Sequence, residues 1–327
     1  QGFDAGVFSQ PSIHRLAYHE IRRRFSLSAQ LAVRAIGKAV ECFHRDKGVC
    51  PIFRPDGAIT YDERNLSFKG LDKVSLSTLT GREIIALVYG EYQAKRFDRI
   101  KGQCDLVRRD GKFYLLATVD LPEDPPVEVA DFIGVDLGIV NIATDSTGET
   151  FTGAKVDRNR KRRATARKQY QRKGTKNAKR RLKRMSGRQS RFQRHTNHVI
   201  SKRLVAKAKA QSVGIVLEDL QHIRSRIEGT VSRRFRRRFG NWSFHHLRQC
   251  ITYKARLAGV PVVCVDPRNT SRTCSQCGHC EKANRQTQES FCCKHCGFST
   301  NGDLNAARNL SRLGRSVNRP QKQRLPS

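Results

Sequence analysis

Short apolar runs that end on acidic residues mark the second half of the chain. The runs and the acids that come directly after them are 132–135 with Asp136, 212–217 with Glu218 and Asp219, and 261–265 with Asp266. Apolar runs of this length between polar flanks are typical of buried strands. We therefore predict a strand at each place, and two more strands at 139–144 and 149–152, on either side of a turn.

A helical periodicity of apolar positions marks other segments. These segments are 11–46, 242–257 and 304–310. The first fits two helices that break near residues 26–28, with Ser28 as the cap of the second helix. Residues 155–210 are strongly basic and rich in good helix formers, which predicts a long helical hairpin broken near Gly174 or Gly187.

Residues 51–120 have a different pattern, with short β-like runs between turn signals such as Asp56-Gly57 and Asp110-Gly111. The runs are 58–61, 74–76, 84–88, 103–107 and 113–119. Several short strands at this spacing predict a small antiparallel barrel, a fold that often binds oligonucleotides. The segment 121–130, which contains Pro125 and Pro126, is the clearest linker in the chain.

From residue 129 onward the predicted order is three antiparallel strands, a helical insertion, a strand, a helix, a strand and a final helix. That order fits a mixed sheet covered by helices, as in the RNase H-like architecture. In such a sheet the carboxyl ends of the first and fourth strands, Asp136 and Glu218, lie side by side. A helix packed across the sheet would bring Asp303 to the same edge.

Three carboxylates at one edge repel each other unless cations neutralise them, and Mg²⁺ or Mn²⁺ suits such ligands. Two ions about 4 Å apart would activate a water for in-line hydrolysis of a phosphodiester, leaving a 5′-phosphate and a 3′-hydroxyl. Asp219 competes with Glu218 for the second position. We favour Glu218 because it directly follows the apolar run, whereas Asp219 is placed to cap the next segment of the chain.

The charge of the chain points to a polyanionic partner. Lysine and arginine number 64 against 29 acidic residues, a formal net charge of +35. Nucleic acid is the leading candidate, because phosphate contacts release counterions and relieve the self-repulsion. No apolar stretch reaches the roughly 20 residues of a membrane-spanning helix. We therefore predict no membrane partner and a cytoplasmic, nucleoid-associated protein.

Two basic segments are the predicted nucleic-acid contacts: the helical hairpin and a loop or lid at 224–238. The side chains expected to make these contacts are Arg160, Lys161, Arg162, Arg163, Lys179, Arg180, Arg181, Lys183, Arg184, Arg236 and Arg237. A solvated charge run is the ordinary interpretation of such a segment. Because this run lies inside a domain rather than in a tail, we favour contact with nucleic acid.

Most of the eleven cysteines cluster near the carboxyl end of the chain. Cys274 and Cys277, then Cys293 and Cys296, form two Cys-x-x-Cys-Gly motifs with the spacing of a four-cysteine zinc site. A closed site of four thiolates is structural, so zinc would brace the loop that delivers Asp303. Cys280 and Cys292 form no such motif and are left out. The scattered cysteines, Cys42, Cys50, Cys104, Cys250 and Cys264, are predicted to be core residues or free thiols.

With these residues in place, the chain resembles TnpB, the OrfB-type protein of bacterial insertion sequences. The matching stretches are Gly-Val-Asp-Leu-Gly at 134–138, Leu-Glu-Asp-Leu at 217–220, Asp-Pro-Arg-Asn-Thr-Ser-Arg-Thr-Cys at 266–274 and Asp-Leu-Asn-Ala-Ala-Arg-Asn at 303–309. Members of this family carry a RuvC-like nuclease domain interrupted by a zinc ribbon, and they resemble type V CRISPR effectors in being RNA-guided DNA endonucleases. They have long been called transposases, although a separate enzyme performs transposition.

The resemblance, which covers roughly residues 11 to 313, implies an α/β multidomain protein with guide RNA and target DNA as partners. It implies the catalytic residues Asp136, Glu218 and Asp303. The expected domains are a helical recognition region at 1–50, a wedge-like β-barrel at 51–128, the RuvC-like nuclease with its basic insertion at 129–268, the zinc ribbon at 269–298, the last nuclease helix at 299–315 and a disordered tail at 316–327. Because the chain starts at Gln1 rather than Met, a first wedge strand is expected to precede it.

Two other functions stay open at this point. A non-catalytic, RNA-guided DNA-binding repressor is disfavoured because all three acids are present. A transposase that joins strands could use the same acids, and a strand-transfer product would distinguish it from a nuclease that only cleaves. The sequence leaves the guide RNA, the motif beside the target, the preferred metal and the oligomeric state open.

Overall fold

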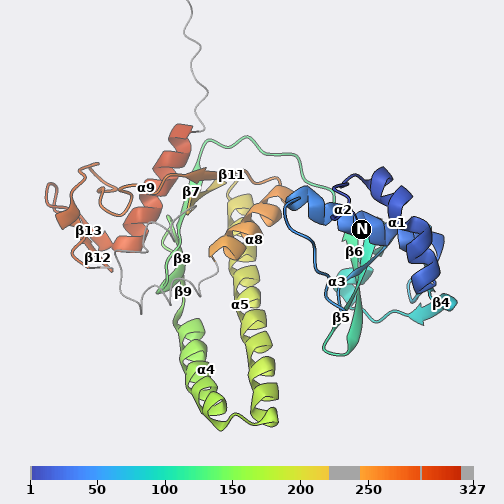
Figure 1. The fold of residues 1–327 in the computed structure, drawn as a ribbon. Helices are drawn as coiled ribbons and strands as arrows, with labels where there is room; N and C mark the ends of the chain where they lie inside the picture. Colours follow the sequence, from blue (N-terminus) through green and yellow to red (C-terminus); the bar gives the residue numbers. More distant parts are fainter. Residues whose placement is uncertain (1, 221–243, 288, 318–327) are drawn as a thin grey trace, which may run out of the picture. The chain divides into compact units, whose positions relative to one another are not determined.

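The computed structural model describes residues 2–220, 244–287 and 289–317 (Figure 1). The chain divides into two compact units, Gln1–Leu121 and Pro122–Ser327. The division falls at the start of the predicted linker, and the rest of that linker is fixed to the second unit. The amide of Asp124 donates to the carbonyl of Leu257 (3.2 Å), that of Val127 donates to Gly259 (3.0 Å), and Val129 is buried.

Two helices open the first unit, as predicted. They are α1 (Gln10–Phe25) and α2 (Ala29–Arg45), and they pack through an apolar cluster of Ile13, Ile36, Val40 and Phe43. The chain breaks at Ser26, which has a left-handed φ of 52°. Ser28 takes the N-cap position of α2, but its side chain makes no capping hydrogen bond. The predicted boundary is therefore correct, while the predicted hydrogen bond of the cap is not formed.

Six strands of the first unit form two antiparallel sheets rather than the single barrel that was predicted. One sheet consists of β1 (Ile59–Tyr61), β5 (Ile100–Arg109) and β6 (Lys112–Val119). The other sheet consists of β2 (Leu66–Lys69), β3 (Lys73–Thr78) and β4 (Gly81–Ala86). Between β4 and β5 the chain forms α3 (Glu91–Ala94) and η1 (Phe97–Arg99), so no strand of residues 87–99 closes the gap between the sheets.

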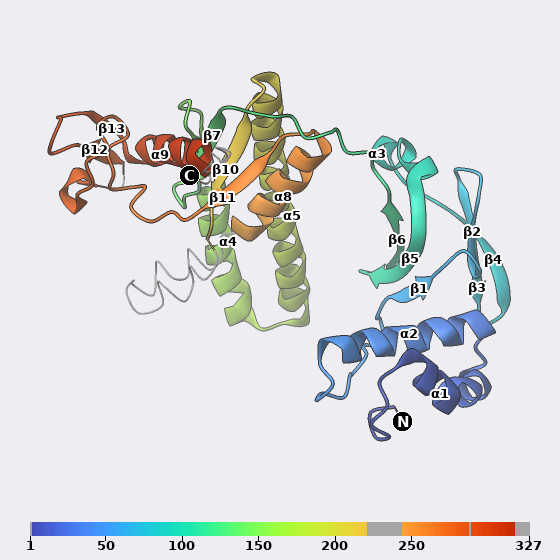
Figure 2. The same cartoon turned by 90° about the horizontal axis from the view of Figure 1, so that it is seen from above.

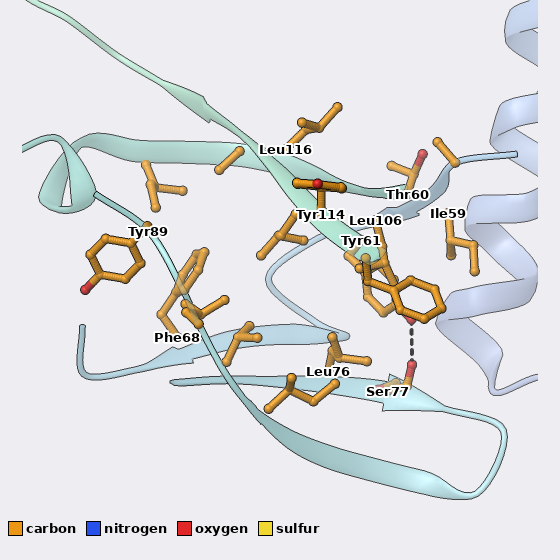
Figure 3. Close-up of a pocket in the computed structure, with 18 of the residues that line it drawn as sticks. Ile59, Thr60, Tyr61, Phe68, Leu76, Ser77, Tyr89, Leu106, Tyr114 and Leu116 are labelled. Carbon is orange, nitrogen blue, oxygen red and sulfur yellow. Dashed lines mark hydrogen bonds between the residues drawn. The ribbon is translucent and has the colours of Figure 1, made fainter. Parts of the chain in front are cut away.

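The two sheets share an apolar cavity of about 1480 Å³ (Figure 3). Its wall includes Ile59, Phe68, Leu76, Tyr89, Leu106, Tyr114 and Leu116. The hydroxyl of Tyr61 on β1 donates to the carbonyl of Ser77 on β3 at 2.9 Å and so joins the sheets. The β-rich region is therefore held together by side chains across this cavity.

Five strands of the second unit form one mixed sheet in the order β11-β10-β7-β8-β9. The strands are β7 (Phe132–Asp136), β8 (Asn141–Asp145), β9 (Thr150–Thr152), β10 (Gly214–Glu218) and β11 (Val262–Val265). β10 lies parallel to β7 and β11, whereas β7, β8 and β9 are antiparallel. The predicted neighbourhood of the first and fourth strands is confirmed.

Helices cover both faces of this sheet (Figures 1 and 2). The last part of α5 (Lys176–Ala210) and α8 (Phe244–Leu257) pack on one face, where Ile133, Val135, Ile215 and Leu217 point. The helix α9 (Gly302–Val317) packs on the other face, against Phe132 and Val216. This alternation is the ordinary two-residue period of a strand that is buried on both sides.

The predicted basic hairpin consists of α4 (Ala154–Lys173) and the first part of α5, and it extends beyond the sheet (Figure 1). It turns at Gly174, which has a left-handed φ of 64°. The helix continues through Gly187, so the alternative break there is wrong. Gly174 is the better breaker because Thr175 directly follows it and caps α5 by accepting from the amide of Ala178.

The end of α9 corrects the predicted tail. The helix continues through Ser316 to Val317, because Gly314 keeps it in contact with Phe132 and Val216. The predicted basic loop, with Arg236 and Arg237, and residues 318–327 lie outside the described residues. None of the described helices is long and apolar enough to cross a membrane.

Candidate functional site

The period of the strands puts two acids on the face covered by α9. Asp136 follows Phe132 and Gly134 on that face of β7, and Glu218 follows Gly214 and Val216 on β10. The register pairs Val216 with Gly134, so the next residues on this face are Glu218 and Asp136. The structure thus brings these two carboxyls together, and they share a hydrogen bond.

The third acid comes from the first turn of α9. Asp303 and Glu218 are buried, with exposed fractions of 6% and 8%. The side chain of Asn301 accepts from the amides of Asp303 (3.0 Å) and Leu304 (3.3 Å), which is an N-terminal cap. Asn141 of β8 donates to a carboxylate oxygen of Asp303 at 2.9 Å. These contacts fix the third carboxylate beside the other two.

Burial and repulsion between the acids dominate the electrostatics of this site. Burial, and then the charge of Asp303, raise the pKa of Asp136 to about 6, against an ordinary value of 3.8, although the hydrogen bond with Glu218 acts in the other direction. Burial and then the charge of Asp136 also raise the pKa of Glu218 well above its ordinary value. Ionisation of both Asp136 and Glu218 is therefore favoured by positive charge nearby.

Arg285 supplies part of that positive charge. Its guanidinium lies 3.4 Å from a carboxylate oxygen of Asp303, and its charge lowers the pKa of both Asp136 and Glu218. Asp219, the alternative second acid, turns away from this group and pairs with Arg248 of α8 at 3.2 Å. The choice of Glu218 over Asp219 therefore agrees with the position of each side chain.

The four cysteines of the predicted zinc site come together. Cys274 and Cys296 have their sulfurs 3.8 Å apart, and those of Cys277 and Cys293 are 3.6 Å apart. A tetrahedral zinc ion with Zn–S bonds of about 2.3 Å separates its sulfurs by about 3.8 Å. The amide of Cys296 donates to the sulfur of Cys293 at 3.5 Å. Although burial acts in the opposite direction, this bond and that from His295 lower the pKa of Cys293 to about 6.

The glycines of the two motifs form the tight turns after the second cysteine of each motif. Gly278 and Gly297 have left-handed φ angles of 81° and 72°, and each amide donates to the carbonyl of the first cysteine of its motif at 3.0 Å. Around them lie η2 (Lys282–Asn284), β12 (Ser290–Cys292) and β13 (Ser299–Asn301). Cys280 is exposed and Cys292 lies within β12, and neither belongs to the cluster of four.

Two asparagines fasten the cysteine-rich segment to α9. Asn305 accepts from the amide of Ser275 (2.9 Å) and donates to the carbonyl of Thr273 (2.8 Å). Asn309, one turn later, donates to the carbonyls of Thr270 (2.8 Å) and Thr273 (2.7 Å). The same helix therefore carries Asp303 and holds the segment that contains the cysteines.

The basic hairpin presents most of the predicted nucleic-acid contacts to solvent. The exposed ones are Lys161, Arg162, Lys179, Arg180, Arg181, Lys183 and Arg184. Arg160 and Arg163 are only partly exposed. Arg160 pairs with Asp157 (3.2 Å), and Arg163 donates to the side chain of Asn159 (2.6 Å) and to the carbonyl of Met185 (2.7 Å). The bond from Arg163 to Met185 joins α4 to α5, whereas the pair of Arg160 with Asp157 lies within α4.

Sequence reasoning missed Asn141 and Arg285 as neighbours of the acids. Neither belongs to a recognisable motif, and each reaches Asp303 only through the fold. Asn305 and Asn309 left a signal, because two asparagines one turn apart on the apolar face of a predicted helix require buried hydrogen-bond partners.

Comparison with known families agrees with this geometry. Residues 116–222 match the OrfB_IS605 family, described as a probable transposase, and residues 244–310 match the Cas12f1-like TNB domain. The first match includes Asp136 and Glu218, and the second includes the four cysteines and Asp303. These matches confirm the resemblance to TnpB-type proteins that the motifs predicted.

Individual relatives extend over most of the chain. It is 26% identical to the CRISPR-associated endodeoxyribonuclease Cas12f1 of Sulfoacidibacillus thermotolerans, over 93% of this chain and 82% of that protein. It is 27% identical to the putative RNA-guided DNA endonuclease InsQ of Escherichia coli, over 88% of this chain and 74% of that protein. A TnpB-like protein of Methanocaldococcus jannaschii is 35% identical over 42% of this chain and 48% of its own length.

A solved structure shares the fold. The cryo-EM structure of the Cas12f1–sgRNA–target DNA complex aligns with a TM-score of 0.62 and 16% identity, covering 86% of this chain and 70% of that one. The mixed α/β fold predicted from the order of elements is therefore confirmed.

Proposed function

We propose that this protein is an RNA-guided, metal-dependent DNA endonuclease of the TnpB type, with an RNase H-like nuclease domain from residue 129 onward. The observation that carries the proposal is the convergence of Asp136, Glu218 and Asp303 from β7, β10 and α9 at one edge of the mixed sheet. Relatives that cover most of the chain are named as endonucleases of this kind, which supports the same activity.

The donor set of this edge fits Mg²⁺ or Mn²⁺. Three carboxylates offer the hard oxygen ligands that these ions prefer. Burial in the first place, and then the charge of neighbouring acids, raise the pKa values of Asp136 and Glu218, so a bound cation would stabilise their ionised forms. Ions held by the three acids would supply Lewis-acid stabilisation and a water of lowered pKa.

The residues around the acids have distinct roles in this proposal. Asn141 and Asn301 orient Asp303, while the positive charge of Arg285 lowers the pKa of Asp136 and Glu218. Asp136 and Glu218 share a proton in the absence of a cation and release it on binding. Metal binding at this site is therefore expected to release protons near neutral pH.

We infer that Cys274, Cys277, Cys293 and Cys296 bind one structural zinc ion and form a zinc ribbon. The spacing of the sulfurs matches a tetrahedral tetrathiolate site. Through Asn305 and Asn309 the ribbon holds the start of α9, and through Arg285 it reaches the acids. Its role in the proposal is to support the position of Asp303.

The charge favours a polyanionic partner, and guide RNA and target DNA are the partners that we propose. The exposed lysines and arginines of α4 and α5 are the surface offered to them. The test is to purify the protein with co-expressed RNA from the flanks of its transposon and to incubate it with Mg²⁺ and matched or mismatched duplex DNA.

Cleavage of the matched duplex alone, with 5′-phosphate and 3′-hydroxyl ends, is the expected result. Joined strands would instead identify a transposase. Binding of RNA and DNA without cleavage would identify a repressor.

A further inference from the structure

A second cluster of metal-ligating side chains lies between α5 and α8, away from the four cysteines. His198 belongs to α5, and His246 and Cys250 stand one turn apart on α8. One ligand atom from each of the three lies within 4.8 Å of the others. Side chains four residues apart on a helix project from the same side, so His246 and Cys250 can act on one ion. We propose that His198, His246 and Cys250 bind a second zinc ion that joins α5 to α8.

The sulfur of Cys250 lies close to both histidine rings. It is 3.8 Å from Nδ1 of His198, and with ordinary Zn–S and Zn–N bonds of about 2.3 and 2.1 Å this separation corresponds to an S–Zn–N angle of about 120°. It lies 3.8 Å from Nδ1 and 3.9 Å from Nε2 of His246, so it faces that ring between its two nitrogens. An ion held by Cys250 and His198 can therefore bind His246 after this ring turns to point one nitrogen at it.

Hydrogen bonds hold the side chains of the cluster. The side-chain amide nitrogen of Asn197 donates to Nδ1 of His246 at 3.0 Å. Binding of an ion through Nε2 of His246 would reverse this contact, with Nδ1 donating to the amide oxygen, the usual arrangement of a metal-bound histidine. The hydroxyl of Tyr253 lies 3.4 Å from Nδ1 of His198, and it marks where a fourth ligand, the hydroxyl or a water, would complete the site.

The charges nearby decide the kind of ion. The positive charges of Lys254 and Arg194 lie near both rings. Lys254 is held by the carbonyl of His198 and the hydroxyl of Ser201, each at 2.7 Å. The positive charges of Lys254 and Arg194 repel a metal ion, so binding of a hard ion that takes no thiolate ligand is disfavoured. Zinc displaces the proton of the Cys250 thiol, and the resulting thiolate offsets the added charge.

The position of the site indicates what it would do. The helix α8 also carries Arg248, which pairs with Asp219, the residue after Glu218. The helix α5 begins in the basic hairpin. An ion between the two helices would fix the base of the hairpin relative to β10. This proposal does not rest on the nuclease activity, and it changes the prediction that Cys250 is only a core residue or a free thiol.

The test is the zinc content of the purified full chain, measured by elemental analysis after gel filtration in metal-free buffer without chelator. We expect about two zinc ions per chain in the wild type and about one in Cys250→Ser and His198→Gln. Cys277→Ser, in the ribbon, should also lose about one ion and keep the other. Cys264→Ser is the matched control, because this exposed cysteine belongs to neither cluster, and it should keep both ions.

Cobalt provides a second measurement. When Co²⁺ replaces zinc in the Cys277→Ser protein, a tetrahedral absorption spectrum with the intensity of one thiolate ligand should remain. Adding Cys250→Ser to the same protein should remove this spectrum. His198 is exposed, so His198→Gln is expected to fold even if Cys250→Ser does not. A wild type with a single zinc ion that depends only on the ribbon cysteines would overturn the proposal, as would a His198→Gln protein that keeps both ions.

Discussion

Asp136 is the residue on which the candidate nuclease site depends most. Its side chain is partly exposed at the end of β7, beside Glu218 and Asp303, and its pKa is raised to about 6. Ionisation of this carboxyl costs stability, although it shares a hydrogen bond with Glu218. Such a cost is typical of a site where stability is given up for function.

Replacement of Asp136 by Asn should therefore stabilise the metal-free protein. The folded pKa of about 6 lies above the ordinary 3.8, so the folded state holds a proton that the unfolded state releases. The free energy of unfolding of the wild type then falls as pH rises between these two values, from 3.8 to about 6. At pH 7 we expect Asp136→Asn to raise the free energy of unfolding by about 1 to 3 kcal/mol, measured by urea denaturation without Mg²⁺ and without chelator, so that zinc is retained.

Asp219→Asn is the matched control for this experiment. Asp219 is adjacent in sequence to Glu218 but pairs with Arg248 and is about 40% exposed, so its removal should change stability by less than about 1 kcal/mol. Added Mg²⁺ should stabilise the wild type and Asp219→Asn more than Asp136→Asn. Equal stability of all three proteins at pH 7 would contradict the description of the acid site.

At the scale of elements, the contact of α9 with β7 positions Asp303. A Cβ on Gly134 would lie 2.0 Å from the carbonyl oxygen of Ala307 and 2.5 Å from the amide of Ser311. Only glycine allows this approach, because backbone atoms cannot move aside as a side chain can. The packing of α9, the helix that carries Asp303, thus explains why residue 134 is a glycine.

Gly134→Ala should push α9 away from the sheet. We expect a loss of about 3 kcal/mol in the free energy of unfolding, at the upper end of overpacking effects, and a loss of DNA cleavage under conditions where the variant is still folded. Gly187→Ala is the control, since Gly187 lies inside α5 and a Cβ there meets only the Arg191 side chain at 3.4 Å. That variant should gain about 0.5 to 1 kcal/mol. Similar effects of the two substitutions would exclude this account of Gly134.

A buried ion pair joins β8 to α5. Asp145 is fully buried and pairs with Lys207, which also contacts Thr147 (2.6 Å) and Glu149 (3.1 Å). Asp145→Asn leaves the ammonium group without its main partner and should destabilise the protein by about 3 kcal/mol in thermal or urea unfolding. Asp124→Asn, which removes an exposed pair with Lys209, should change stability by less than about 1 kcal/mol. Equal losses in both variants would refute the assigned role of Asp145.

Sequence patterns predicted the elements of the second unit better than those of the first. The strands β7 and β10 and their acids were predictable because a buried apolar run followed by a carboxylate is a local feature. The division of the β-rich region into two sheets was not, since it depends on how residues 87–99 pass between them. β2 was missed because its residues Leu66–Lys69 alternate between apolar and polar and form no apolar run.

The contacts within the site show the same limit. The cysteine motifs fixed the ribbon ligands, because their spacing carries the information. Arg285, Asn141 and the cluster of His198, His246 and Cys250 depend on residues far apart in sequence, with no motif to join them. Such contacts become visible only when the fold brings the elements together.

For the whole molecule, the net charge of +35 predicts strongly salt-dependent binding of nucleic acid. Each phosphate contact contributes a slope of about 0.9 in the logarithm of affinity against that of salt. Replacing Lys161, Arg162, Lys179 and Arg180 together by Gln should lower the slope by up to about 3 to 4, as measured by fluorescence anisotropy over a salt series. Lys161→Arg with Lys179→Arg keeps the charge and should keep the slope. An unchanged slope in the Gln variant would exclude the hairpin as the nucleic-acid surface.

The central claim concerns the three acids, and guided cleavage of matched duplex DNA in Mg²⁺ tests it most directly. The protein, purified with its co-expressed RNA, would be compared with Asp136→Ala, Glu218→Ala and Asp303→Ala, and with Asp219→Ala as the matched control. We predict that the wild type and Asp219→Ala cut the DNA, whereas the other three bind RNA and DNA but reduce cleavage by at least about a thousandfold, or 4 kcal/mol. Cleavage that persists in Asp136→Ala, or that is lost equally in Asp219→Ala, would contradict the account.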